Sequence, residues 1–316
     1  MATYKGINGY AVQTVASDPS PGDPGQVFYN TTAKTFEYTT LSPNGAWATG
    51  GNLPASKRLA AGAGTQTAAL LAGGGEPVSN ASFEYDGTTW TAGGNLGTAR
   101  EGLAGCGTQT VAVVFGSRTP PAGVLTEEYD GTTWTAGGNL GTGRGALASA
   151  GTQTTALGIG GEAAPARTTA TEEYNGTSWT AGGNLATAVA MLGGAGLQTS
   201  ALAFGGQITP GDQVGTTEEY DGTSWTAGGS LNNARAALGG CGTQTAALGA
   251  GGGPSTLTEL YNGSTWTNVA SMSVSKGWPI LVGTQTSALC AGGEGIVSTE
   301  EFTGGPVNVN KTISFS

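Results

Sequence analysis

One phrase recurs along the whole chain and limits the folds available to it. EEYDGTTWTAGGNLGTGR, residues 127–144, is repeated with few changes at 83–100, 172–189 and 218–235. In each copy a tryptophan precedes the glutamine of a TQT or LQT triplet by a constant 19 residues. These pairs recur with periods of 41 to 46 residues: Trp47 and Gln66, Trp90 and Gln109, Trp134 and Gln153, Trp179 and Gln198, Trp225 and Gln244, Trp266 and Gln285. The chain is therefore built from six copies of one unit.

The length and pattern of this unit predict a four-stranded blade of a β-propeller. A period of roughly 40 to 50 residues with alternating apolar positions is typical of such blades, and no window has the apolar spacing of a helix longer than one turn. In one copy we expect inner strands at 102–107 and 111–115 and outer strands at 126–129 and 132–136. Asp130-Gly131 predicts a type I′ turn between the outer strands, with positive φ at both central residues.

The two ends of the repeat complete each other. The last copy carries Gln285 and Phe302 in place of the tyrosine but ends without a tryptophan, whereas the Trp47 strand precedes any inner strand. Pairing the Trp47 strand with the last copy removes both loose sheet edges. We therefore predict an all-β, six-bladed propeller of antiparallel blades over residues 46–303, with an N-terminal extension at 1–45 and a C-terminal tail at 304–316.

Paired glycines close one strand in five copies, and a tyrosine and a tryptophan follow. The pairs are Gly73-Gly74, Gly160-Gly161, Gly205-Gly206, Gly251-Gly252 and Gly292-Gly293. Over residues 47–303 this pattern resembles the kelch-type β-propeller repeat, whose members serve as enzymes, adaptors and adhesins, so the resemblance implies the fold rather than a function. One copy departs from the pattern at Phe115-Gly116-Ser117, where a local bulge would tolerate the missing glycine.

Differences among the copies fall in one connection. The spacing from the triplet glutamine to the next tyrosine or phenylalanine varies from 17 to 22 residues, while the other two spacings are constant. The variable connections are 75–82, 117–126, 161–171, 206–217, 252–258 and 293–299. We expect them on the same face as the loops between blades, which carry Arg58, Arg100, Arg144, Val189, Arg235 and Lys276. Binding residues usually lie on loops held by a rigid frame, so this face is the predicted recognition surface, although loops also vary where nothing constrains them.

The repeated aromatic residues are predicted to be scaffold, with the tryptophans packed between blades: Trp47, Trp90, Trp134, Trp179, Trp225, Trp266, Tyr85, Tyr129, Tyr174, Tyr220 and Tyr261. The candidate ligand-binding residues are polar residues of the variable face: Arg100, Arg118, Arg144, Arg167, Arg235, Gln207, Asp212 and Gln213. The arginines at 100, 144 and 235 would hold carboxylate or sugar groups through bidentate hydrogen bonds, or each would pair with a glutamate of its own blade. The triplet glutamines would ring one mouth of the channel or stabilise their own turns.

Composition argues against several functions. The net charge is −10, and the 11 lysines and arginines are not clustered, so we expect no binding to nucleic acid or to anionic membranes. No apolar run approaches the length of a membrane span, and the N-terminal residues lack the pattern of a signal peptide. The sequence has no histidine, which is the usual general base and a common metal ligand. We therefore predict no metal, no cofactor and no enzymatic activity.

The acids and cysteines are consistent with this prediction. Adjacent glutamates such as Glu127 and Glu128 point to opposite faces of a strand and cannot share a substrate. A glycosidase, which uses two carboxylates, would therefore need the copy-specific acids Glu76, Glu101, Glu162, Asp212 and Glu294. Cys106, Cys241 and Cys290 are too few for a disulfide framework, and we expect Cys106 and Cys241 to be small buried side chains.

The N-terminal segment suggests a setting for the propeller. Residues 16–25 form a Pro/Gly-rich linker, and residues 26–40 predict two short strands around a Thr-Thr-Ala-Lys turn. The stretch PGQVFYNTT is similar to modules of tail-fibre and other virion proteins of bacteriophages, particularly marine ones. This resemblance implies a virion protein, assembled in the host cytoplasm, that attaches to other virion proteins through residues 1–45 and binds a host-surface glycan or protein. A structural decoration protein of the capsid or tail, a bacterial adhesin or scaffold, and association into a homo-oligomer remain open.

Overall fold

The computed structural model describes residues 13–15, 27–42, 44–119, 121–163, 166–253, 255–305 and 307–312. The chain divides into two compact units, Trp47–Thr303 and the paired terminal segments Met1–Ala46 and Gly304–Ser316. The linker predicted at 16–25 lies outside the described residues.

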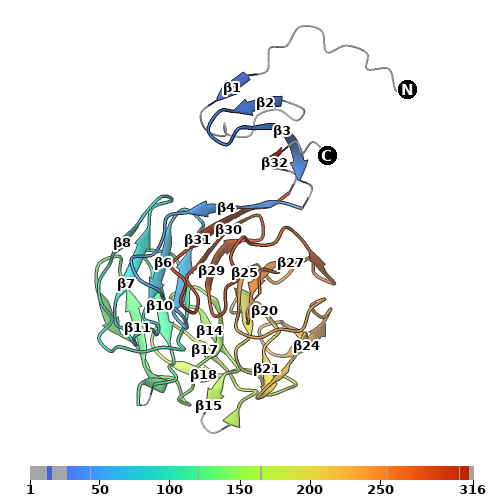
Figure 1. Ribbon diagram of the computed structural model, residues 1–316. Coiled ribbons are helices and arrows are strands. Elements are labelled where there is room, and N and C mark those ends of the chain that lie inside the picture. Colours follow the sequence, from blue (N-terminus) through green and yellow to red (C-terminus); the bar gives the residue numbers. More distant parts are fainter. Residues whose placement is uncertain are drawn as a thin grey trace. The chain divides into compact units, whose positions relative to one another are not determined.

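The larger unit is a six-bladed β-propeller, as the sequence predicts (Figure 1). Blade 1 contains β5 (Ala61–Gly64), β6 (Ala69–Ala72), β7 (Ser82–Tyr85) and β8 (Trp90–Ala92); blade 2 contains β9 (Ala104–Gly107), β10 (Ala112–Phe115), β11 (Thr126–Tyr129) and β12 (Trp134–Ala136); blade 3 contains β13 (Ala148–Gly151), β14 (Ala156–Ile159), β17 (Thr171–Tyr174) and β18 (Trp179–Ala181). Blade 4 contains β19 (Gly193–Leu197), β20 (Ser200–Phe204), β23 (Thr217–Tyr220) and β24 (Trp225–Gly228); blade 5 contains β25 (Leu238–Thr243), β26 (Ala246–Gly251), β27 (Thr258–Tyr261) and β28 (Trp266–Asn268); blade 6 contains β29 (Ile280–Thr284), β30 (Ser287–Ala291), β31 (Thr299–Thr303) and β4 (Ala46–Gly50).

Blade 6 confirms the predicted closure of the ring. Its outermost strand, β4, carries Trp47 and lies beside β31, so the blade combines the first and last strands of the repeat region. The inner strands contact one another in ring order, β5, β9, β13, β19, β25, β29 and back to β5. Small side chains permit this approach: a Cβ on Gly239 of blade 5 would lie 2.4 Å from the Cβ of Leu281 in blade 6.

Three of the variable connections contain short secondary-structure elements. Blade 2 carries a 3₁₀ turn, η1 (Ala122–Val124). Blade 3 carries the two-stranded hairpin of β15 (Glu162–Ala163) and β16 (Ala166–Arg167), and blade 4 carries that of β21 (Gln207–Thr209) and β22 (Asp212–Gln213).

The repeated phrase is used mainly for contacts between neighbouring blades. Tyr129 Oη of blade 2 donates to Glu84 Oε1 of blade 1 at 2.6 Å, and Trp134 Nε1 donates to the Gly94 carbonyl at 2.9 Å. Equivalent tyrosine–glutamate hydrogen bonds of 2.6 Å join Tyr174 to Glu128, Tyr220 to Glu173, Tyr261 to Glu219 and Tyr85 to Glu301. Trp179 of blade 3 packs against Phe115 of blade 2, with ring centroids 4.6 Å apart, and this contact confirms the predicted packing of tryptophan between blades.

One blade interface replaces this polar pair with an apolar one. Phe302 of blade 6 stands where the other blades have tyrosine, and Leu260 of blade 5 stands where its acceptor glutamate would be. Both side chains pack in the same apolar cluster. The two changes are matched, because tyrosine opposite leucine would bury a hydroxyl without an acceptor.

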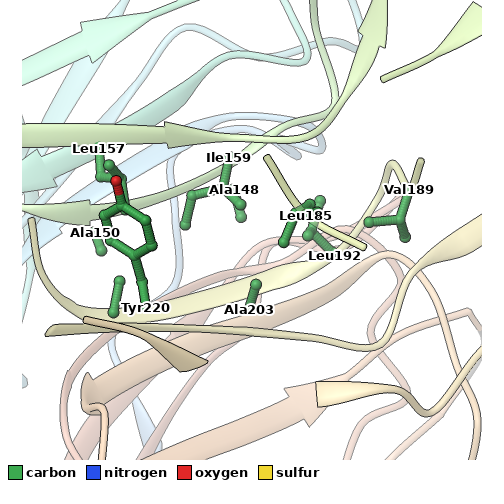
Figure 2. Close-up of a cluster of buried hydrophobic side chains, with 10 residues drawn as sticks. Ala148, Ala150, Leu157, Ile159, Leu185, Val189, Leu192, Ala203 and Tyr220 are labelled. Atoms are coloured by element: carbon green, nitrogen blue, oxygen red, sulfur yellow. The ribbon is translucent and has the colours of Figure 1, made fainter. Parts of the chain in front are cut away.

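Apolar clusters fill the spaces between sheets, and Figure 2 shows the one between blades 3 and 4. Leu157 and Ile159 of β14 contribute from one side, and Ala203 and Tyr220 of blade 4 from the other. Each of these four side chains is at least 97% buried. Burial of a side chain the size of leucine or isoleucine stabilises the fold by roughly 1.5–3 kcal/mol, so these clusters hold neighbouring blades together.

The outer turn differs from the predicted type I′ turn. Tyr129 pairs with Trp134, which leaves four residues in the loop, and of Asp130 and Gly131 only the glycine has positive φ, at 91°. Asp130 Oδ1 accepts the backbone N–H groups of Thr132 at 2.8 Å and Thr133 at 2.7 Å. The side chain thus satisfies donors that a two-residue turn would not leave free, and Asn175 does the same in blade 3.

The triplet glutamines also differ from prediction. Gln109 Nε2 donates to the carbonyls of Ala69 at 3.1 Å and Tyr85 at 2.7 Å, both in the preceding blade. The other five glutamines make the same two bonds. They stabilise the contact between blades rather than their own turns.

The terminal unit is a four-stranded sheet in the order β1 (Gln13–Val15), β2 (Val27–Asn30), β3 (Thr35–Ser42) and β32 (Val307–Thr312). β2 and β3 flank the Thr-Thr-Ala-Lys turn that the sequence predicts, and Asn30 Oδ1 accepts N–H groups of that turn. β32 pairs antiparallel with β3. The N-terminal extension and the C-terminal tail, treated separately at the sequence level, therefore share one sheet.

Candidate functional site

The variable connections and the loops between blades meet on one face of the propeller, called the variable face below. Backbone hydrogen bonds join the two sets of loops: Gly75 N donates to the Arg58 carbonyl at 2.9 Å, and Gly145 N donates to the Glu162 carbonyl at 3.0 Å. Each variable connection is therefore anchored at its first residues, and only its outer part is free to differ.

A ring of six equivalent residues lines the channel near this face. All six have φ between 51° and 69°, in the left-handed region: Leu59, Gly102, Ala146, Met191, Ala237 and Trp278. From Gly102 to Trp278 each backbone N–H donates to the carbonyl of the preceding member at 2.8 or 2.9 Å. Left-handed backbone at a non-glycine residue costs of order 1–3 kcal/mol, and these hydrogen bonds hold it in place. The fold thus fixes one backbone position per blade at the axis, where a cavity of about 130 Å³ is lined by residues of all six inner strands.

A second ring of equivalent positions surrounds the first: Gly75, Arg118, Glu162, Gln207, Gly253 and Glu294. Its polar members are linked. Arg118 Nη2 lies 3.0 Å from Glu162 Oε2, and Arg167 Nη2 lies 3.9 Å from Glu162 Oε1 and 2.6 Å from Gln207 Oε1. The sequence-predicted candidates Arg118, Arg167 and Gln207 are therefore brought together, with Glu162 between the two arginines.

Trp278, in the loop that leads into blade 6, also contacts this cluster. The Arg118 guanidinium lies over its indole ring, 5.9 Å from the centroid, in a cation–π contact between blades 2 and 6. Sequence reasoning missed this residue, although a signal was present: it is the one tryptophan of seven outside the repeated phrase.

Arg58 forms a separate cluster where blades 1 and 6 meet. Its guanidinium lies 3.4 Å from Glu76 Oε1 and 3.1 Å from Glu294 Oε1. The structure also corrects its alignment. Lys57, not Arg58, is the equivalent of Arg100, because the Lys57 carbonyl accepts Gly293 N as the Arg100 carbonyl accepts Gly74 N.

Three predicted ligand-binding arginines are not available to a ligand as predicted. Arg100, Arg144 and Arg235 are at least 97% buried, and each forms an ion pair within its own blade, with Glu127, Glu172 and Glu259 respectively. The Arg100 guanidinium also donates to the Leu125 carbonyl at 2.8 Å. The arginine recurs because it forms a buried ion pair in each of these blades, since a buried guanidinium needs acceptors. This is the second of the two alternatives that the sequence left open.

Blade 4 shows what the variable face looks like without this arginine. Val189 occupies the position, and the acid Glu218, equivalent to Glu127, is partly exposed beside a small cavity lined by Val189 and Phe204. The last two candidates, Asp212 and Gln213, lie on the exposed strand β22 at the tip of the blade 4 hairpin. They project from the same face as Gln207, with which Gln213 is paired.

The three cysteines, all of them in the described part of the chain, are not activated as nucleophiles. Burial raises the pKa of the Cys106 and Cys290 thiols to about 12, and raises that of Cys241 as well, so all three stay protonated. Both cysteines that were predicted to be buried, Cys106 and Cys241, are buried. Among the residues that the structure describes, no three histidine, cysteine or acidic side chains are grouped as a metal site, and no helix is long and apolar enough to cross a bilayer.

Comparisons with known proteins support the fold. No protein-family model matches the chain, and no curated protein matches it. Among solved structures it is similar to one described as "Structure of YjhT", with a TM-score of 0.63 and 15% sequence identity, over 84% of this chain and 97% of that chain. At this identity the likeness shows the β-propeller fold alone.

Proposed function

We propose that the chain is a kelch-type, non-enzymatic structural protein of a phage particle, on a fibre, tail or capsid, whose variable face binds a host-surface glycan or protein. The observation that carries the recognition part is the contrast between the two faces. Turns of the opposite face repeat the same Asp or Asn and Gln contacts, whereas equivalent backbone positions of the variable face carry different side chains, such as Arg118, Glu162 and Gln207.

Two further observations support the proposal. The phage-like PGQVFYNTT stretch lies in the terminal unit, which forms its own sheet and leaves the six blades complete without it. The absence of histidine and the buried, protonated thiols favour binding over catalysis. In this proposal residues 1–45 attach to other virion proteins.

The first test is antibody labelling of purified particles, imaged by electron microscopy. Label at fibre or tail tips supports host recognition. Label spread over the capsid supports the alternative of a decoration protein, and particles without label refute the virion assignment in favour of an adhesin or scaffold.

A loop exchange separates recognition from decoration. Replacing residues 206–217 with the shorter connection 252–258 keeps a connection that the fold already accepts. Recognition predicts lost adsorption with intact particles, and decoration predicts lost assembly.

A further inference from the structure

A pocket opens on the variable face between the connection of blade 2 and the loop that leads into blade 3. Its volume is about 430 Å³, within the range of roughly 300–1,000 Å³ found for small-molecule sites. Arg118, Glu162, Pro121, Gly123 and Gly143 are among the residues that line it. It lies beside the channel, not in it, because its lining residues do not include those of the axial cavity.

Glycines of the loop that leads into blade 3 let the blade 2 connection lie close beside it, and the two segments together wall the pocket. Gly143 is the only glycine at its repeat position, since the equivalent residues of the other blades are Ser56, Ala99, Ala188, Ala234 and Ser275. A Cβ on Gly145 would lie 2.4 Å from Arg118 N, so a side chain there would push the blade 2 connection away. The connection is also tied down, since Arg144 N donates to the Gly123 carbonyl at 3.1 Å.

The polar wall of the pocket is one donor beside one acceptor. The Arg118 guanidinium and the Glu162 carboxylate are 3.0 Å apart, with 35% and 25% of their side chains exposed. Arg144, which also lines the pocket, is paired with Glu172 at 3.0 Å. These charges cancel in pairs, so an anionic ligand would meet the Glu162 carboxylate and a cationic one the Arg118 guanidinium.

The donor is held in place before any ligand arrives. Arg118 N donates to the Glu101 carbonyl at 2.8 Å, and its guanidinium lies over Trp278. Its aliphatic part packs against the bare Cα of Gly102, where a Cβ would lie 2.4 Å from Arg118 Cγ. A side chain fixed in this way loses little freedom on binding, which favours affinity.

We propose that this pocket binds one residue of a neutral glycan. Each sugar hydroxyl both donates and accepts, so of two neighbouring hydroxyls one accepts from Arg118 and the other donates to Glu162. The Pro121 ring gives an apolar surface for the C–H face of the sugar. The proposal rests on the recognition function above and specifies its ligand.

The test is titration of the purified full chain with neutral hexoses, N-acetylhexosamines and their disaccharides, followed by calorimetry and saturation-transfer NMR. Inorganic phosphate and acetate serve as charged comparisons. We expect at least one neutral sugar to bind, and Glu162→Gln to weaken it about tenfold, since a hydrogen bond to a charged group is lost. Arg118→Ala should abolish binding.

Glu294→Gln is the matched control, because Glu294 occupies the equivalent position in blade 6 outside the pocket. It should leave binding unchanged, and unchanged thermal midpoints show that each variant is folded. The pocket assignment is overturned if no sugar in the panel binds, if phosphate or acetate binds in preference, or if Glu162→Gln binds as well as the parent chain. Sugar binding is measured on the isolated chain and labelling on particles, so either proposal can fail without the other.

Discussion

The tyrosine–glutamate bonds between blades permit a quantitative test against an internal reference. Tyr129→Phe removes the hydroxyl that donates to Glu84 at 2.6 Å and accepts from Gly94 N at 3.3 Å. A hydrogen bond to a charged group contributes about 1.5–3 kcal/mol, and the carboxylate loses its partner, so we expect a cost of about 2 kcal/mol. In a unit of this size, that lowers the thermal midpoint by about 4–8 °C.

The double variant Tyr129→Phe, Glu84→Leu copies the natural pair Phe302 and Leu260. Because both polar groups are then absent, we expect it to be more stable than the sum of the single changes predicts, with a coupling energy of about 1–2 kcal/mol. Urea unfolding with an unchanged m-value measures all four members of the cycle.

The reverse cycle at blades 5 and 6 is the control. Phe302→Tyr alone buries a hydroxyl opposite Leu260 and should destabilise the protein, and adding Leu260→Glu should recover most of the loss. Additive effects in both cycles, within about 0.5 kcal/mol, would refute the view that the two residues act as a pair.

Three further predictions concern charge. Arg100→Val copies Val189 of blade 4 and should lower the free energy of unfolding, measured with urea, by about 3 kcal/mol, which is the low end for a broken buried ion pair. We expect the low end because the partly exposed Glu218 shows that the carboxylate at the position of Glu127 is able to reach solvent. Burial and the glutamate hydrogen bond raise the pKa of four of the inter-blade tyrosines from 10 to about 12, so the folded state favours their neutral form. The free energy of unfolding should therefore be constant below about pH 10 and fall between about pH 10 and 12, and a falling thermal midpoint over that range would show this. Backbone N–H donors lower the pKa of Asp130 below 3.8, so the stability that its carboxylate contributes is present above that pH and lost below it. Asp130→Asn introduces the residue found at Asn175 and should make the free energy of unfolding fall less steeply with pH in acid. An unchanged pH dependence in acid would contradict the role of Asp130 in the turn.

The repeat predicts most of the propeller, because spacing determines where strands begin and which copies are equivalent. The strands 126–129 and the closure through Trp47 follow from that spacing alone. A local bulge was suggested as a way to tolerate Ser117 in place of the second glycine. β10 pairs in continuous register through Phe115, and Ser117 N makes the usual bond to the next blade, to the Arg144 carbonyl at 2.9 Å. The paired β3 and β32 have no repeat to relate them, so their shared sheet was not predicted.

The site was harder to predict than the fold. A recurring arginine in a loop suggests a surface ring, and only the position of Glu127 inside the same blade shows that the cation is buried. The link from Arg118 to Trp278 joins residues 160 positions apart in two different blades, and no local sequence pattern brings these two side chains together.

The contacts between blades also bear on how such a gene changes length. Each of blades 1 to 4 carries a tyrosine, a tryptophan and a glutamine that bind the preceding blade, together with the glutamate and carbonyls that the next blade uses. A blade duplicated by unequal recombination within blades 1 to 4 would therefore carry both the donors and the acceptors that it needs to bind its two neighbours. Leu260 and Phe302 replace the glutamate and the tyrosine at the interface of blades 5 and 6. A crossover between them would separate these matched residues, so recombination has to keep blades 5 and 6 together.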